Sequence, residues 1–285
     1  MSANEPMANP APLAWRRLWR KPGAVLGAAL VAAFTALALF APVVAPYSPM
    51  EMDFRAVQQP PSLAHPFGTD DLGRDVFSRV AYGARISLQV GLIAVGIAAV
   101  IGTAMGLIAA LAGGWLDGVI MRSVDVMLAF PGILLALAVV AVLGPGLANM
   151  MIAVGVSAIP VYARTVRGTT LSVMELDYVV AARSLGAGHV RVALRYVLPN
   201  VSAPIIVLAT IGIATSILSA AGLSYLGLGA QPPTPEWGSM LSDARAYLRT
   251  GWWMAVFPGL AIMIVVMAFN LLGDGLRDVL DPRTR

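Results

Sequence analysis

The sequence has no cysteine and a single lysine, Lys21, among its 285 residues. Without cysteine the chain can form no disulfide, thiolate metal site or cysteine nucleophile. Cysteine usage therefore does not indicate whether the protein lies in an oxidising or a reducing compartment. A nucleotide-binding P-loop has the form G-x-x-x-x-G-K-S/T, whereas Lys21 lies in "RKPG". The chain therefore contains no P-loop ATPase site of its own.

Charged residues are also scarce: they make up 12% of the chain, against 58% hydrophobic residues. Soluble domains carry about 25% charged residues, so this composition predicts an integral membrane protein. The net charge of +4 comes from arginines scattered over separate segments. Because they form no single basic patch, the charge does not indicate nucleic-acid binding.

Six apolar stretches approach the roughly 20 residues that a helix needs to cross a bilayer. They are 24–45, 86–112, 123–143, 147–163, 201–228 and 252–272. The first follows "WRRLWRKPG", but its apolar run exceeds that of a signal peptide, so we interpret it as an uncleaved anchor. The sequence predicts an all-α, polytopic membrane protein with six transmembrane helices.

Lysine and arginine counts predict the orientation. The two terminal tails and the segments 113–122 and 164–200 together hold 13 of these residues. The segments on the opposite side of the membrane, 46–85, 144–146 and 229–251, hold 6. Since cytoplasmic loops carry the excess, both termini are predicted to be cytoplasmic. The predicted divisions are a cytoplasmic tail 1–23, a transmembrane helix 24–45, a periplasmic segment 46–85, a five-helix core 86–273 that includes the cytoplasmic loop 164–200, and a cytoplasmic tail 274–285.

Ionisable residues are nearly absent from the six stretches. The exception is Asp125, near a helix end, with Arg122 three residues earlier as a predicted partner. Ion-coupled transporters and pumps generally carry ionisable groups within their helices, so a proton relay is disfavoured. The lack of ionisable residues does not bear on sodium binding, because backbone carbonyls can coordinate sodium. Gly102 and Gly106 form a small-xxx-small pattern that predicts close helix packing.

The segment 164–200 contains two amphipathic stretches separated by "GAG" at 186–188. The first stretch has Tyr178, Ala181, Ala182 and Leu185 on one helical face. The second runs from Val190, and Pro199 is predicted to end it. Periodicity alone leaves two interpretations open: a pair of helices lying at the lipid headgroups, or a docking element for a soluble partner.

Within this segment, "AARSLGAGHVRVALRYVLP" resembles the EAA loop of bacterial ATP-binding-cassette (ABC) importer permeases. That pattern is E-A-A, three residues, Gly, nine residues, I-x-L-P. The matching positions are Ala181, Ala182, Gly186, Leu198 and Pro199. Val180 replaces the glutamate and Tyr196 replaces the isoleucine. The resemblance implies a coupling loop formed by Ala181, Ala182, Arg183, Gly186, Leu198 and Pro199.

Three further stretches, 65–88, 223–241 and 269–283, are similar to the dipeptide/oligopeptide/nickel permease family, in its C-type subunit. "AFPGILLALAVVAVLG" and "LGLGAQPPTPEWG" look particularly like glutathione importer permeases, and dipeptide permeases are also similar. The resemblance implies a type I ABC importer permease (MetI-like) fold with an extra N-terminal helix. It implies import of small peptides, with nickel or another small solute as the alternative within the family.

The same resemblance implies the partners: a homologous permease as the other half of a heterodimer, two ABC ATPase subunits, and a periplasmic or lipid-anchored substrate-binding protein. ATP and magnesium would then belong to the ATPases, and this chain would have no cofactor, no metal and no catalytic residue. Its place would be the bacterial inner membrane, in contact with lipid. A secondary transporter driven by an ion gradient is the rival outside this family.

The stretch "HPFGTDDLGRD" (65–75) is predicted to lie outside, before the second span. Its histidine and aspartates, His65, Asp70, Asp71 and Asp75, are the residue types of a metal site, which would make the chain a membrane enzyme. Pro66 and two glycines instead favour a structured turn, with Thr69 or Asp70 as the helix N-cap. Local pairing of Asp71 with Arg74, or of Asp75 with Arg79, is expected at helical spacing.

A second external loop, "PPTPEWG" (232–238), offers Glu236 and Trp237 as a polar and an aromatic contact at the water interface. We therefore predict a periplasmic group with a structural or partner-contact role. It comprises Gly68, Thr69, Asp70, Gly73, Arg74, Asp75, Glu236 and Trp237.

Overall fold

The computed structural model describes residues 18–280, so most of the predicted N-terminal tail and the end of the C-terminal tail lie outside the described residues. The elements are α2 (Pro22–Val44), α3 (Val76–Ala112), α4 (Gly114–Leu128), α5 (Gly132–Leu143), α6 (Leu147–Met174), α7 (Asp177–Ser184), α8 (His189–Val192), the π-helix η1 (Ala193–Val197), α9 (Leu198–Tyr225), α10 (Trp237–Ala244), the 3-10 turn η2 (Arg245–Tyr247) and α11 (Trp253–Leu280). Within 18–280 every regular element is a helix, and the only strand-like pairing is an isolated bridge between Thr69 and Asp75. The predicted fold class is confirmed.

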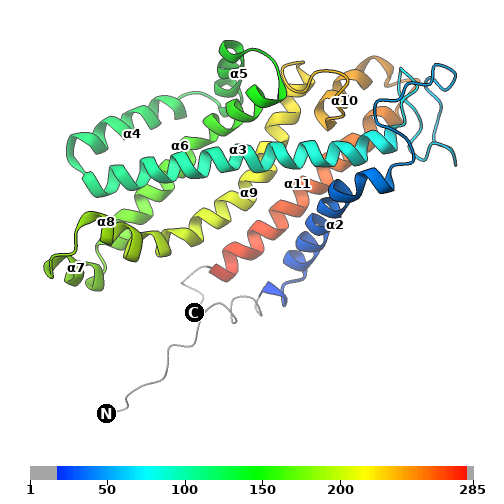
Figure 1. Ribbon diagram of the computed structural model, residues 1–285. Helices are drawn as coiled ribbons and strands as arrows, with labels where there is room; N and C mark the ends of the chain where they lie inside the picture. Colours follow the sequence, from blue (N-terminus) through cyan, green and yellow to red (C-terminus); the bar gives the residue numbers. More distant parts are fainter. Residues whose placement is uncertain (1–17, 281–285) are drawn as a thin grey trace.

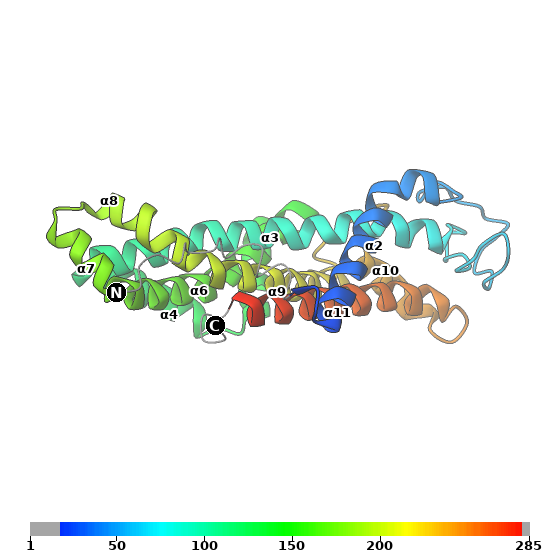
Figure 2. The same cartoon turned by 90° about the horizontal axis from the view of Figure 1, so that it is seen from below.

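Five of these helices are long and apolar enough to cross a membrane, and the bent pair α4–α5 brings the number to six. The long helices α3, α6, α9 and α11 run along the length of an elongated bundle (Figure 1). The short helices α7 and α8 form one end, and α10 with the segment 45–75 forms the other, as the second view also shows (Figure 2).

The N-terminal helix α2 packs against α11 through glycines. A Cβ on Gly27 would lie 2.7 Å from the Ala268 carbonyl oxygen, and one on Gly275 would lie 2.3 Å from the Ala24 Cβ. At the start of α2 the Lys21 ammonium pairs with the Asp278 carboxylate of α11. The beginning of α2 and the end of α11 therefore lie at the same level of the bundle.

The central contact joins α3 and α6 through the predicted glycine pair. A Cβ on Gly102 would lie 2.8 Å from the Ile159 carbonyl oxygen, and one on Gly106 would lie 2.6 Å from the Ala163 carbonyl oxygen. Gly155 of α6 approaches the Ala94 carbonyl oxygen of α3 in the same way, at 3.0 Å. The predicted role of the small-xxx-small pattern in helix packing is confirmed.

The third span is not the single helix predicted over 123–143. It consists of α4 and α5, which meet at an angle of 96°. Pro131 precedes α5, and its extended conformation (φ −53°, ψ 132°) is one that a residue in a continuous helix cannot adopt. The residue before a proline is also pushed out of the α region, which explains the break after Leu128.

The helices around the cytoplasmic loop are longer than predicted. α6 continues to Met174, so residues 164–174 are helical rather than part of the loop. The predicted helix end at Pro199 is wrong, because α8, η1 and α9 together form one apolar helix from His189 to Tyr225. Pro199 therefore lies inside a continuous helix, directly after the π-helix η1. A proline in a helix interior disturbs the regular hydrogen-bond ladder, and the π-helix marks this irregularity.

We predict that Gly106→Ala destabilises the protein by about 1–3 kcal/mol, because the new methyl group would force α3 away from the α6 backbone. Gly96→Ala is the matched control: it lies on the same helix with nothing within 4 Å of its Cβ position. This control should be neutral or slightly stabilising, since alanine favours helix more than glycine does. Thermal unfolding in detergent compares the two, and equal stability of both variants would contradict the packing role.

Candidate functional site

The end of the molecule formed by α7 and α8 carries the predicted coupling loop (Figure 1). Helix α7 ends in a Schellman motif: the Gly186 N–H donates to the Arg183 carbonyl, and the Ala187 N–H donates to the Ala182 carbonyl at 3.0 Å. This motif needs a left-handed residue after the helix, and Gly186 supplies it with φ +86°. The glycine of the pattern therefore has a defined structural task.

The surface of this loop is open. Ala181, Arg183 and Gly186 are exposed, Ala182 is half-buried, and nothing lies within 4 Å of a Cβ on Gly186. On the adjoining helix Leu198 is half-buried and Pro199 is exposed. Small residues on an exposed helix leave a shallow surface, which another backbone can approach closely.

Beneath this surface a cluster of six buried valines joins the loop to the long helices. It consists of Val166, Val173, Val179, Val192, Val197 and Val201. Val179 of α7 is fully buried between residues of α6 and α9. On the other side the Asn200 Nδ2 donates to the Tyr178 hydroxyl at 3.0 Å. The sequence analysis missed this cluster, because its members come from five elements, α6, α7, α8, η1 and α9, and show no common spacing.

Two ion pairs connect α4 to α6. The Arg167 guanidinium donates to both carboxylate oxygens of Asp117 at 2.6 Å, and Arg164 pairs with Asp125. The predicted pairing of Asp125 with Arg122 is therefore wrong. The partner lies 39 residues further along the chain, because α6 extends past residue 163 and brings its arginines alongside α4.

At the opposite end, the N-cap of α3 is Asp75 rather than Thr69 or Asp70. Its Oδ2 accepts a hydrogen bond from the Ser78 N–H at 2.7 Å, and the helix begins at Val76, ten residues earlier than the predicted span. The other carboxylate oxygen lies 3.0 Å from the His65 Nδ1. Both oxygens of this aspartate are therefore occupied by residues of the turn and the helix start.

Next to this cap lies a buried ion cluster. The Asp70 carboxylate accepts from the Arg74 Nε at 2.6 Å and lies 3.6 Å from the Arg79 Nε. Arg79 is 2% exposed and also donates to the Pro49 carbonyl at 3.1 Å. Arg74 reaches Asp71 at 3.6 Å and Asp243 of α10 at 3.9 Å. Burial raises the pKa of Asp243, and the two arginines oppose that rise.

The remaining members of the turn hold the backbone in place. Gly68 and Gly73 have φ values of +73° and +74°, and a Cβ on Gly73 would lie 1.8 Å from the Asp53 carbonyl oxygen. The Thr69 hydroxyl accepts from the Gln59 N–H at 2.8 Å. Within residues 18–280, no three His, Asp or Glu side chains form a group that could hold a metal ion. The aspartates considered as metal ligands bind arginines, backbone and His65 instead.

Glu236 and Trp237 are buried, which corrects their predicted place at the water interface. Trp237 is fully buried, and its Nε1 donates to the Val80 carbonyl of α3 at 3.0 Å. Glu236 caps α10 by accepting from the Gly238 and Ser239 N–H groups, each at 2.9 Å. Burial raises the pKa of Glu236, and these donors oppose the rise. Trp237 thus attaches the loop 232–238 to α3, and Glu236 attaches it to α10.

The sequence matches two protein-family models. Residues 102–285 match the binding-protein-dependent transport system inner membrane component family. Residues 10–61 match the N-terminal transmembrane domain of oligopeptide transport permease C. The second match covers α2 and the beginning of the external segment, so the extra N-terminal helix also has a counterpart in known permeases.

Curated relatives are similar over nearly the whole chain. The chain is 53% identical to the glutathione transport system permease protein of Escherichia coli and 48% identical to the dipeptide transport system permease protein of Alkalihalophilus pseudofirmus. Each similarity spans 272 residues, which is 95% of this chain and 90% of the relative.

Among solved structures, a chain of the MetNI methionine ABC transporter in an inward-facing conformation has a TM-score of 0.60 at 20% identity. The match covers 71% of this chain and 97% of that chain. At this identity the likeness shows the fold alone, and it confirms the MetI-like architecture.

We predict that Arg79→Met lowers the free energy of unfolding by about 3–5 kcal/mol, because it leaves the Asp70 carboxylate buried without its full set of counter-charges. The control is Arg85→Met, an exposed arginine on the same helix. Thermal unfolding of the purified variants measures both. If the two variants lose the same amount, the cluster does not stabilise this end of the bundle.

Proposed function

The chain belongs to the binding-protein-dependent transport system inner membrane component family, and from this membership we propose that it imports short peptides of the dipeptide or glutathione type. It is the permease subunit of an ABC importer and a multi-pass protein of the inner membrane. As a permease it forms a pore and is not an enzyme. The substrate class rests on the two relatives at 48% and 53% identity, which are named for dipeptide and glutathione transport.

Energy for import comes, in this proposal, from ATP hydrolysed with magnesium by two separate ATPase subunits. One of them docks on α7, where Ala181, Ala182 and Gly186 present the shallow surface. A homologous permease completes the pore, and an external binding protein delivers the peptide. Both termini lie in the cytoplasm, in agreement with the arginine counts and with the ion pair that holds Lys21 beside Asp278.

The observation that carries the coupling role is the valine cluster under α7. A docked ATPase that moves α7 also moves Val179, which is packed without solvent access against valines of α6 and α9. Close-packed interiors have low compressibility and transmit strain. A displacement at the loop therefore reaches two transmembrane helices as a rigid-body motion instead of being absorbed locally.

Transport of radiolabelled dipeptide or glutathione by the complete complex in proteoliposomes tests the proposal. We expect uptake that requires ATP, the binding protein and intact ATPase subunits. The control is a complex whose ATPase subunits cannot hydrolyse ATP, which should show no accumulation. Uptake driven by a sodium or proton gradient without ATPase subunits would instead identify a secondary transporter.

A bulky side chain on the docking surface should uncouple the importer. We expect Ala181→Trp to reduce ATP-dependent uptake at least tenfold, because the indole ring would hold the partner backbone away from α7, while Ala181→Ser should retain uptake. Co-purification of the ATPase subunits and membrane insertion are measured in parallel. Unchanged uptake and co-purification in the tryptophan variant would place the docking surface elsewhere.

A further inference from the structure

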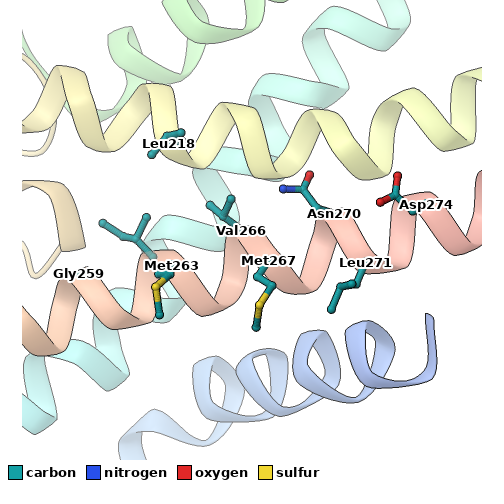
Figure 3. Close-up of a pocket in the computed structure, with 9 residues that line it drawn as sticks. Leu218, Gly259, Met263, Val266, Met267, Asn270, Leu271 and Asp274 are labelled. Carbon is teal, nitrogen blue, oxygen red and sulfur yellow. The ribbon is translucent and has the colours of Figure 1, made fainter. Parts of the chain in front are cut away.

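A groove of about 600 Å³ lies between α9 and α11 (Figure 3). Its lining includes Leu218 of α9 and, on α11, Met263, Val266, Met267, Asn270 and Asp274. The last five lie at positions i, i+3, i+4, i+7 and i+11, which share one broad face of α11. In Figure 3 Asn270 and Asp274 point from α11 toward α9. A groove of this volume matches the size of small-ligand sites.

One end of the groove carries two polar side chains that have no hydrogen-bond partner within the described residues. Asn270 and Asp274 are exposed, and neither side chain forms a hydrogen bond or ion pair with any residue of 18–280. The next acid of the helix, Asp278, is bound to Lys21. Asn270 lies within the predicted sixth span and Asp274 two residues beyond it. The groove therefore has a carboxylate available for a cation and an amide available for hydrogen bonds.

The outward side of α3 differs in this respect. Between Val90 and Ala112 every exposed residue of α3 is apolar, including Leu92, Val100 and Ile108, which is the composition that lipid tails require. A free amide or carboxylate at membrane depth is costly unless it faces protein or water. Asn270, which lies within the predicted span, therefore indicates that this side of α11 faces protein or water rather than lipid tails.

We propose that this groove is part of the wall of the translocation path and binds the peptide in transit, with Asp274 pairing with its α-ammonium group and Asn270 hydrogen-bonding its backbone. This inference rests on the proposed peptide import. Asn270 and Asp274 lie about 6 Å apart along the helix, and successive residues of an extended peptide are about 3.5 Å apart. An ammonium group at Asp274 therefore places an amide group within reach of Asn270.

The methionines fit the same occupant. Met263 and Met267 are 56% and 44% exposed, and methionine is flexible and polarizable, so it adapts to apolar groups of different shapes. Main-chain groups, which all peptides share, would meet the polar end of the groove. Side chains, which vary, would meet the adaptable end. This division suits a path that passes many sequences and leaves selection to the binding protein.

Thiol labelling tests whether the groove is an aqueous path. The chain has no cysteine, so Met263→Cys, Met267→Cys and the control Val100→Cys each introduce one thiol into it. We expect a charged methanethiosulfonate reagent to modify residues 263 and 267 in the complex in nanodiscs during turnover, but not residue 100. Modification of 263 and 267 by a lipid-soluble maleimide alone would overturn the inference, and so would their inaccessibility to both reagents.

Peptide contact is tested by protection. A saturating transported dipeptide should slow modification of Met267→Cys at least fivefold, and this protection should disappear when Asp274→Asn is added and return with Asp274→Glu. Asp278→Asn is the matched control and should leave protection intact. Protection that survives Asp274→Asn, or that is absent in a complex importing the dipeptide, would overturn this inference alone. A wild-type complex that imports no peptide would instead contradict the proposed function.

Discussion

The close approach of α3 and α6 at Gly102 and Gly106 is the contact on which the rest of the structure depends. Lipid tails are as apolar as leucine, so no hydrophobic force drives two such helices together, and small residues that let backbones touch replace it. The N-terminal end of α3 carries the buried ion cluster, and the C-terminal end of α6 carries two of the six valines. The packed pair therefore connects the two ends of the molecule as one rigid unit.

The two ends are held by different kinds of interaction. At the end that carries the segment 45–75, Asp70, Arg74 and Arg79 form directional contacts in a buried site, and each would leave an uncompensated charge if its partner moved. At the end that carries α7, valine side chains pack without directional bonds, so they can move together while staying in contact. The first arrangement fixes a geometry, and the second transmits a displacement.

Sequence reasoning succeeded for the apolar runs and the glycine turn. It failed where several nearby residues were equally good signals and where the chain folds back on itself. The number of spans follows from runs of apolar residues, and the turn at Gly186 follows from its place after α7. Asp75 was missed as the cap of α3 because Thr69 and Asp70 are equally good capping residues and precede it. Arg164 could not be matched to Asp125 without knowing that α6 continues past the apolar run.

The extension of α9 connects the proposed docking surface with the groove. Helix α9 does not begin at Pro199 but continues without interruption from α8 through η1, so one helix runs from the coupling loop to Leu218 in the groove wall. Between the loop and Leu218, a Cβ on Gly273 of α11 would lie 2.5 Å from the Ile211 side chain of α9. The two helices therefore have little room to approach each other at this point. In the proposed mechanism, motion imposed at α7 changes the distance between α9 and Met263, beyond this contact. The proposed ATPase contact and the proposed peptide path thus lie toward opposite ends of one continuous helix, His189–Tyr225.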